Sequence, residues 1–190
     1  MFRKAIAALI VSGAFAAPAF AADYVIDPTH THVAFKIDHL GFSRVLGYFA
    51  DVSGTLTFDP ANIDASKLNV TIKPDTLNTN LAQRDTDVKG ADWLNTAEFD
   101  TITYVGKKFA KTDEAHGTIE GDLTLHGVTK PVTLSVTLNK SGEHPMTKAQ
   151  AVGFDATATL KRSDFGVTTY IPYIGDEIKI DISLEAQAAK

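Results

Sequence analysis

The chain has 190 residues, enough for one domain with a sizeable core, and its 23 acidic and 18 basic residues give a net charge of −5. This acidic balance argues against binding to nucleic acid or to an anionic membrane surface through charge. The sequence contains no cysteine, so the hydrophobic core must hold the fold without disulfides.

The N-terminal segment has the pattern of a secretory signal. Arg3 and Lys4 form a short basic region, and an apolar run too short to cross a bilayer follows at 5–17. Ala19-Phe20-Ala21 then matches the small-x-small pattern of a cleavage site. We therefore expect residues 1–21 to be a cleaved signal peptide and residues 22–190 to form one domain. A short membrane anchor is less favoured, because polar sequence follows at once.

The remaining chain mostly alternates apolar and polar residues, which is typical of half-buried β-strands. The clearest case is 118–138, where two alternating runs meet at His126-Gly127 and predict a hairpin. Gly127 can adopt the positive φ that a tight connection needs. We expect 45–58 to be one long strand with a bend at Gly54. Nine segments are candidates for the about eight strands predicted, namely 24–26, 33–38, 45–58, 68–72, 101–109, 118–125, 132–138, 149–161 and 178–184.

One segment, 76–96, lacks the alternation of apolar and polar residues that is typical of a strand. It contains the single Trp and many charges, and we predict two short helices there, at 81–89 and 91–94, separated by Gly90. Loops and caps at the ends of barrels often carry function.

Consecutive strands with short connections predict an all-β, antiparallel meander. It can close as a sandwich of two sheets or as one rolled sheet. We favour a barrel of about eight strands with a short helical insert, because the insert is too small to cover an open sheet face. Small residues on the apolar strand faces, such as Ala50, Gly54, Ala156 and Ala158, favour an internal lumen over a filled core.

Several motifs follow one another over nearly the whole chain after residue 22. They are DPTHT (27–31), HLGFS (39–43), GYF (47–49), NTN (78–80), RD (84–85), ADWLN (91–95), GDLTLHGVTKPV (121–132), VGF (152–154) and RSDFG (162–166). In this order they resemble the YceI-like polyisoprenoid-binding family, and 121–132 is the most specific of them.

The resemblance implies a lipocalin-like barrel that encloses a long isoprenoid chain, such as a polyprenyl lipid or the tail of a quinone. It also implies export to the periplasm and a link to stress. The chain departs from the family pattern at 86–90, where TDVKG stands in place of a His and a Leu-Arg pair. That departure leaves any role of the family His open.

The ligand-binding residues expected on this basis surround the lumen and its mouth. Arg84 and Asp85 either contact a lipid head group or fix the helical insert by a salt bridge or cap, and Arg162 and Asp164 raise the same choice. The aromatic loop 165–175 either gates the channel or packs as a satellite core, and at Tyr170 we favour a mouth. The complete set of expected ligand contacts is Phe35, His39, Phe49, Arg84, Asp85, Trp93, Phe154, Arg162, Tyr170 and Tyr173.

His30, His32 and His39 invite a metal interpretation, since His30 and His32 would share one strand face. No carboxylate or Cys completes a recognisable motif with them, so hydrogen-bonded or solvated His is favoured and we expect neither metal nor cofactor. The sequence has no nucleophile elbow, His-Glu helix motif or Gly-rich phosphate loop, so we predict a binding protein and not an enzyme.

Three alternatives to an isoprenoid carrier remain. In the first, the ligand is a fatty acid or fatty amide. In the second, the protein holds a quinone for a membrane cytochrome. In the third, it is an enzyme, an isomerase or hydrolase that acts on a bound lipid. The exposed strand faces allow a homodimer, although no residue specifies one. An apolar patch at the Tyr170 loop would allow transient contact with a membrane or a partner.

Overall fold

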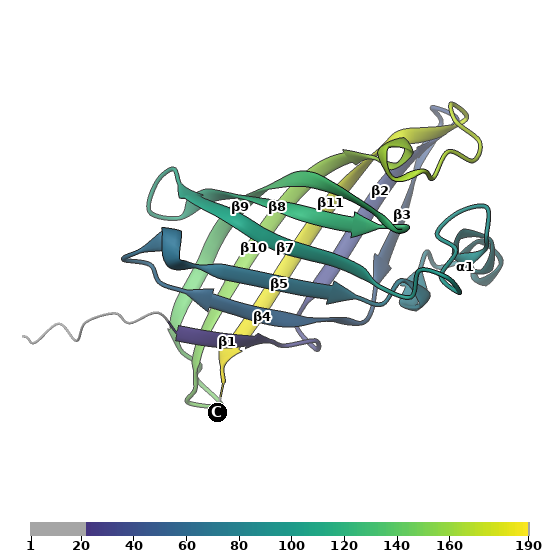
Figure 1. The fold of residues 1–190 in the computed structure, drawn as a ribbon. Helices are drawn as coiled ribbons and strands as arrows, with labels where there is room; N and C mark the ends of the chain where they lie inside the picture. Colours follow the sequence, from purple (N-terminus) through teal and green to yellow (C-terminus); the bar gives the residue numbers. More distant parts are fainter. Residues whose placement is uncertain (1–21, 190) are drawn as a thin grey trace, which may run out of the picture.

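The computed structural model describes residues 22–189, so the predicted signal peptide at 1–21 lies outside the described residues. Within them, one sheet contains all the strands (Figure 1). The strands are β1 (Ala22–Ile26), β2 (His32–His39), β3 (Ser43–Phe49), β4 (Val52–Phe58), β5 (Lys67–Ile72), β6 (Leu77–Asn78), β7 (Ile102–Lys111), β8 (His116–Leu125), β9 (Val128–Glu143), β10 (Gln150–Lys161) and β11 (Ile174–Ala188). The single α-helix in residues 22–189 is α1 (Ala82–Lys89), and short 3-10 turns lie at η1 (Ile63–Ala65), η2 (Pro74–Thr76) and η3 (Arg162–Phe165).

Eight strands close into an antiparallel barrel in the order β1-β4-β5-β7-β8-β9-β10-β11, with β11 returning to β1. This confirms the predicted barrel. β11 is long enough to pair with two strands on the same edge. Its beginning pairs with β2 from Ile174 to Ser183, and its end pairs with β1 through Tyr24↔Ala188. β3 and the two-residue β6 extend the sheet outward from β2.

The β8–β9 hairpin lies where the alternation predicted it. His126 and Gly127 both have positive φ (51° and 72°), as a two-residue hairpin turn of the favoured hand requires. The turn packs against the rest of the barrel end. The His126 ring lies 4.6 Å from the Phe99 ring, and its Nδ1 lies 3.1 Å from the carbonyl oxygen of Phe165.

The prediction of one strand over 45–58 is wrong. The chain turns at Ala50 and Asp51, and their backbone N–H groups both donate to the hydroxyl of Thr76 at 3.1 Å. This break changes which residues face inward. Phe49 is buried and Tyr48 is 41% exposed, the reverse of what unbroken alternation predicts. Ala50, expected to line the lumen, is exposed.

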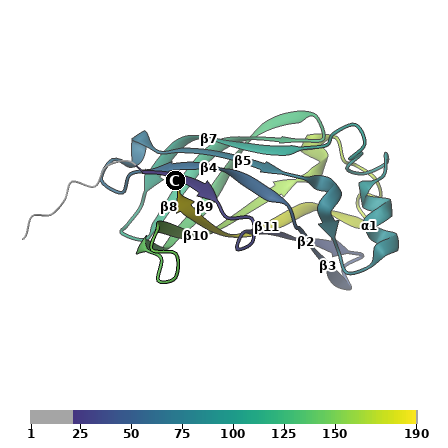
Figure 2. The same ribbon diagram turned by 90° about the horizontal axis from the view of Figure 1, so that it is seen from below.

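The predicted helix at 81–89 is present as α1, but the second helix at 91–94 is absent. There the chain forms turns, with the Trp93 N–H donating to the Gly90 carbonyl and the Leu94 N–H to Val88. Figure 2 shows that α1 lies across one end of the barrel. Among residues 22–189, no helix is both long and apolar enough to cross a bilayer.

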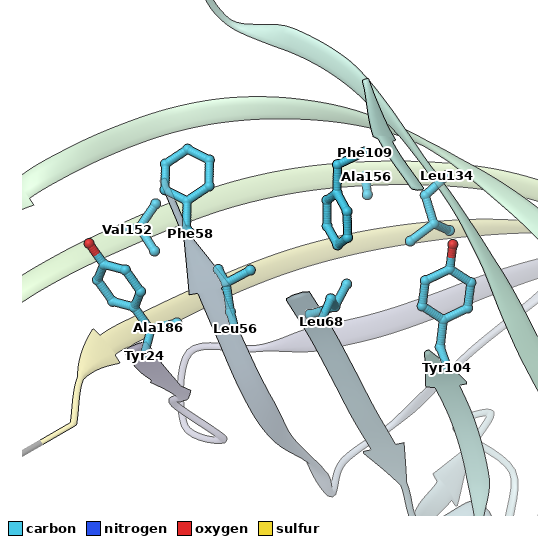
Figure 3. Close-up of a cluster of buried hydrophobic side chains, with 10 residues drawn as sticks. All are labelled: Tyr24, Leu56, Phe58, Leu68, Tyr104, Phe109, Leu134, Val152, Ala156 and Ala186. Carbon is cyan, nitrogen blue, oxygen red and sulfur yellow. The ribbon is translucent and has the colours of Figure 1, made fainter. Parts of the chain in front are cut away.

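The core is formed by inward side chains on opposite walls of the barrel. Figure 3 shows one of its two clusters, in which side chains of β1, β4 and β5 point toward those of β9, β10 and β11. The second cluster lies nearer α1 and includes Phe49, Val52, Leu77 and Phe165. Partly buried apolar residues accompany both clusters, because the two walls do not meet along the whole barrel axis.

Candidate functional site

A cavity of about 540 Å³ runs through the barrel. Its walls are the apolar sides of the strands, so the lumen predicted from small inward residues is present, and Ala156 and Ala158 line it. Typical wall residues are Val33, Phe35, Ile37, Leu56, Phe58, Leu68, Val70, Ile72, Leu123, Leu134, Phe154, Ile180 and Ile182. The cavity is more than three times the volume of the ~150 Å³ engineered cavity that admits benzene.

Polar and charged lining residues gather at the two ends of this channel. At the end covered by α1, which we call the mouth, the lining includes His39, Arg84, Trp93, Arg162 and Tyr170. These residues come from β2, α1, the turns after α1, η3 and the loop before β11. The mouth is therefore assembled from loops far apart in the sequence, which all emerge at one end of the barrel (Figure 1).

Arg162 is buried at the mouth, with 1% of its surface exposed. Its guanidinium donates to the carbonyl oxygens of Gly175 (2.9 Å), Val167 (3.0 Å) and Ile174 (2.9 Å), and lies 5.0 Å from the centre of the Trp93 ring. Burial lowers the pKa of Arg162, and the nearby Asp176 carboxylate partly offsets this. An arginine remains charged at neutral pH even so. Arg162 thus fixes the loop before β11 and places a positive charge beside the channel.

Arg84 and Asp85 converge on Thr79, which is 4% exposed. Arg84 donates from Nε to the Thr79 hydroxyl (2.8 Å) and from Nη2 to its carbonyl oxygen (2.6 Å). The Asp85 carboxylate accepts from the Thr79 backbone N–H (2.7 Å) and hydroxyl (2.6 Å). The hydrogen bond from the Thr79 hydroxyl is the main cause of the lowered pKa of Asp85. These contacts anchor α1 over the mouth.

The opposite end of the channel lies under the β7–β8 hairpin. Lys111, Asp113, Glu114 and His116 line it there. Asp113 accepts hydrogen bonds from the backbone N–H groups of Ala115 and His116 (both 2.9 Å), and these bonds lower its pKa. The Leu138 N–H on β9 donates to the Ala115 carbonyl at 2.7 Å, which holds the tip of the hairpin against the barrel end.

Most of the expected ligand contacts lie around one continuous space. Eight of the ten line the cavity, namely Phe35, His39, Phe49, Arg84, Trp93, Phe154, Arg162 and Tyr170. Asp85 and Tyr173 do not line it. Asp85 instead holds Thr79, and Tyr173 is 66% exposed on the outer side of the mouth. Ligand contact by any of the ten remains a prediction.

Sequence reasoning overlooked two residues that build the mouth. Thr79 lies within the NTN motif (78–80), which by itself predicts no role for it, although it binds both Arg84 and Asp85. Asp176 accepts from the backbone N–H (2.9 Å) and hydroxyl (2.8 Å) of Ser163, which is the capping role that the sequence suggested for Asp164. A contact across 13 residues leaves no local signal, whereas an Asp within the turn does.

Of the three histidines considered for metal binding, only His39 lines the channel, and His32 is exposed at the start of β2. His39 is at the mouth, and His30 lies before β2 on the outside, where its Nδ1 is 2.9 Å from a carboxylate oxygen of Asp27. Asp27, His30 and Glu185 place their potential ligand atoms within 4.8 Å of one another. Hydrogen bonding to Asp27 is the main cause of the raised pKa of His30.

Comparison with known proteins places these features in a family. Residues 24–186 match the family described as the YceI-like domain. The chain is 41% identical to "UPF0312 protein" of Pseudomonas savastanoi pv. phaseolicola, which covers 100% of both chains. It is 42% identical to "Protein YceI" of Escherichia coli O157:H7 over 92% of each chain.

Solved structures share the fold. The YceI protein of Campylobacter jejuni is 32% identical, with a TM-score of 0.71 over 82% of this chain and 91% of that one. A polyisoprenoid-binding domain from Saccharophagus degradans, implicated in plant cell wall breakdown, has a TM-score of 0.68 over 90% of this chain and 100% of that one. At 14% identity the latter likeness shows the fold alone.

Proposed function

The chain belongs to the YceI-like domain family, and from this premise we propose that it is a carrier that encloses the tail of a long-chain isoprenoid lipid. The tail would be that of a polyprenyl lipid or a quinone. We propose further that the protein works in the periplasm after removal of residues 1–21. The observation that carries the proposal is the apolar channel, whose charged residues are confined to its ends.

The size and lining of the channel suit a long hydrocarbon. Scaled from the benzene-sized cavity, about 540 Å³ holds roughly 20 carbon atoms, or four isoprene units. Burial of each CH2 group contributes about 0.8 kcal/mol, so such a tail gains roughly 16 kcal/mol before the cost of ordering it. A polar metabolite would lose hydrogen bonds to water along the same walls and gain few in return.

The residues at the mouth are suited to bind the head group of the lipid. Arg84 and Arg162 line the channel there beside Trp93, and an arginine can donate to a carbonyl, hydroxyl or phosphate oxygen. Since Arg162 already donates to three carbonyl oxygens, Arg84 is the better candidate for a contact that a ligand would strengthen.

The test is to identify the lipid that the protein retains. Native mass spectrometry of protein purified without detergent, followed by lipid extraction, should reveal a bound isoprenoid. Arg84→Ala should lower its recovery several-fold while leaving the barrel folded, because the apolar walls are unchanged and Asp85 still holds α1 to Thr79. Lys89→Ala removes the same charge from the same helix outside the channel lining and serves as the control. Recovery of a fatty acid or fatty amide would replace the proposed ligand class, and recovery of no lipid would count against a carrier.

A further inference from the structure

An exposed apolar tip lies beside the mouth. It consists of Leu40 and Phe42 in the β2–β3 turn and of Tyr170 and Tyr173 in the loop before β11. Phe42 is 90% exposed, and the other three are between 49% and 67% exposed. The backbone N–H of Leu40 donates to the carbonyl oxygen of Tyr173 at 2.8 Å, so the two segments form one surface. Figure 1 shows both segments at the mouth end of the barrel.

The β2–β3 turn, which carries part of this tip, has a leucine at a central position where that residue type is unfavourable. Leu40 and Gly41 have φ of 56° and 74°, and the Phe42 N–H donates to the His39 carbonyl at 3.1 Å. A turn of this type favours Asn, Asp or Gly at both central positions. A leucine there sacrifices stability to present a large apolar side chain to the outside, and such local strain is a reason to look for a function.

The tip is continuous with the channel. His39, which precedes Leu40, lines the cavity, and so does Tyr170, a residue that is also 67% exposed. An apolar molecule leaving the channel past these two residues therefore meets the tip before it meets open solvent. Tyrosine rings with an apolar face and a polar hydroxyl are suited to a membrane–water interface.

The negative charge of Asp38, next to the tip, is neutralised by contacts within the protein. One carboxylate oxygen of Asp38 accepts from Arg44 at 2.6 Å, and the other accepts from the Gly41 N–H at 2.8 Å. The chain as a whole is acidic, with a net charge of −5. A surface that is apolar and locally neutral on an acidic protein suits an uncharged bilayer surface and not an anionic one.

We propose that this tip docks the protein on a zwitterionic lipid bilayer, with Phe42 and Leu40 inserted among the head groups, so that a lipid passes between bilayer and channel without crossing water. The proposal rests on the proposed carrier function. It adds the surface through which the carrier meets the source or destination of its ligand.

The experiment is co-sedimentation of the full chain with phosphatidylcholine vesicles. Phe42→Ser and Leu40→Asn should each lower the vesicle partition coefficient about tenfold. Each replaces a large apolar side chain that would be buried in the bilayer when the protein is bound. Met146→Ser, which removes an 83% exposed side chain on the β9–β10 turn at the other end of the barrel, should leave partitioning unchanged. Leu40→Asn supplies the residue that the turn favours, so misfolding cannot explain its loss of binding.

Three results would overturn the docking proposal. They are equal partitioning of the native protein and both tip variants, stronger binding to vesicles enriched in phosphatidylglycerol, and dissociation of a native dimer by Phe42→Ser without loss of vesicle binding. The last would assign the tip to a second copy of the chain. Neither Leu40 nor Phe42 lines the channel, so lipid extracted from the same preparations tests the carrier function separately. Loss of vesicle binding with retained lipid supports the tip, and vesicle binding without any extracted lipid contradicts the carrier alone.

Discussion

Asp27 organises the crossing between β1 and β2, the two strands that share β11. One of its carboxylate oxygens accepts from the backbone N–H (2.8 Å) and hydroxyl (2.6 Å) of Thr29, and the other lies 2.9 Å from His30 Nδ1. Its own backbone N–H donates to the Glu185 carbonyl on β11 at 2.9 Å. The hydrogen bonds from Thr29 and then His30 lower the pKa of Asp27 to about 2.

This lowered pKa predicts a contribution to stability that depends on pH. A carboxylate with a depressed pKa stabilises the fold above its ordinary pKa and loses that contribution as the pH falls through its folded pKa. Asp27→Asn should therefore cost about 1–2 kcal/mol of the free energy of unfolding above pH 4. The difference from the native protein should shrink between about pH 4 and pH 2.

Urea unfolding followed by circular dichroism across this pH range would measure the effect. Asp164→Asn, on the exposed side of η3, is the control and should change little. A cost for Asp27→Asn that stays constant down to pH 2 would mean that the carboxylate charge is not what stabilises the crossing.

At the scale of single elements, β7, β8 and β9 are joined by a side chain as well as by their backbones. Tyr104 of β7 passes over Gly121 of β8, and its hydroxyl lies 2.9 Å from the Ile119 carbonyl oxygen and 3.0 Å from that of Val132. Burial is the main cause of the raised pKa of Tyr104. Gly121 leaves the room for this crossing, since a Cβ there would lie 2.5 Å from the tyrosine ring.

Gly121→Ala should lower the free energy of unfolding by about 1–3 kcal/mol, because the added methyl group displaces the ring or the strand. Gly153→Ala on β10 is a matched control. A Cβ at Gly153 meets its nearest atoms at 3.9 and 4.0 Å, which is ordinary contact. Chemical denaturation of the two variants compares them directly. Equal stability would show that the barrel wall relaxes around Tyr104 without cost.

The elements also explain what the sequence could and could not predict. Alternation located most strands, and β10 follows it from Phe154 to Leu160 with its alternate residues lining the cavity. It failed at Ala50, where the strand break depends on hydrogen bonds to Thr76, 26 residues away. The role of Arg162 was equally hidden, because two of the carbonyl oxygens that it binds, those of Ile174 and Gly175, lie 12 and 13 residues away. Thr79 lies only five and six residues before Arg84 and Asp85, but no motif of the sequence marks it as their common partner. The alternation of apolar and polar residues predicts which face of a strand a residue occupies. It does not predict contacts at the mouth between segments that come together only in the folded barrel.

For the whole molecule, the channel sets how much of a ligand can be enclosed. Ala158→Phe adds an aromatic ring to the apolar wall and should shorten the tail that fits inside. We expect the bound lipids recovered by mass spectrometry to shift toward shorter chains or to fall several-fold in amount. Some destabilisation from overpacking is expected as well, on the order of 1–3 kcal/mol.

Thr159→Phe places the same ring on the outer face of the same strand and is the control, since Thr159 is exposed. Comparing the two separates occupation of the channel from a general effect of an added aromatic residue. If both variants retain the native lipid in native amount, the tail does not pass Ala158.

The pairing of β1 with β11 has a kinetic consequence. Tyr24 and Ala188 are partners, so the barrel closes only when residues from opposite ends of the sequence meet. Such distant contacts are slow to form, because the entropy of closing the intervening loop is lost before the strands pair. During synthesis, β1 therefore has no β11 to pair with until residues 174–188 have been made. The barrel therefore stays open until most of the chain has been synthesised.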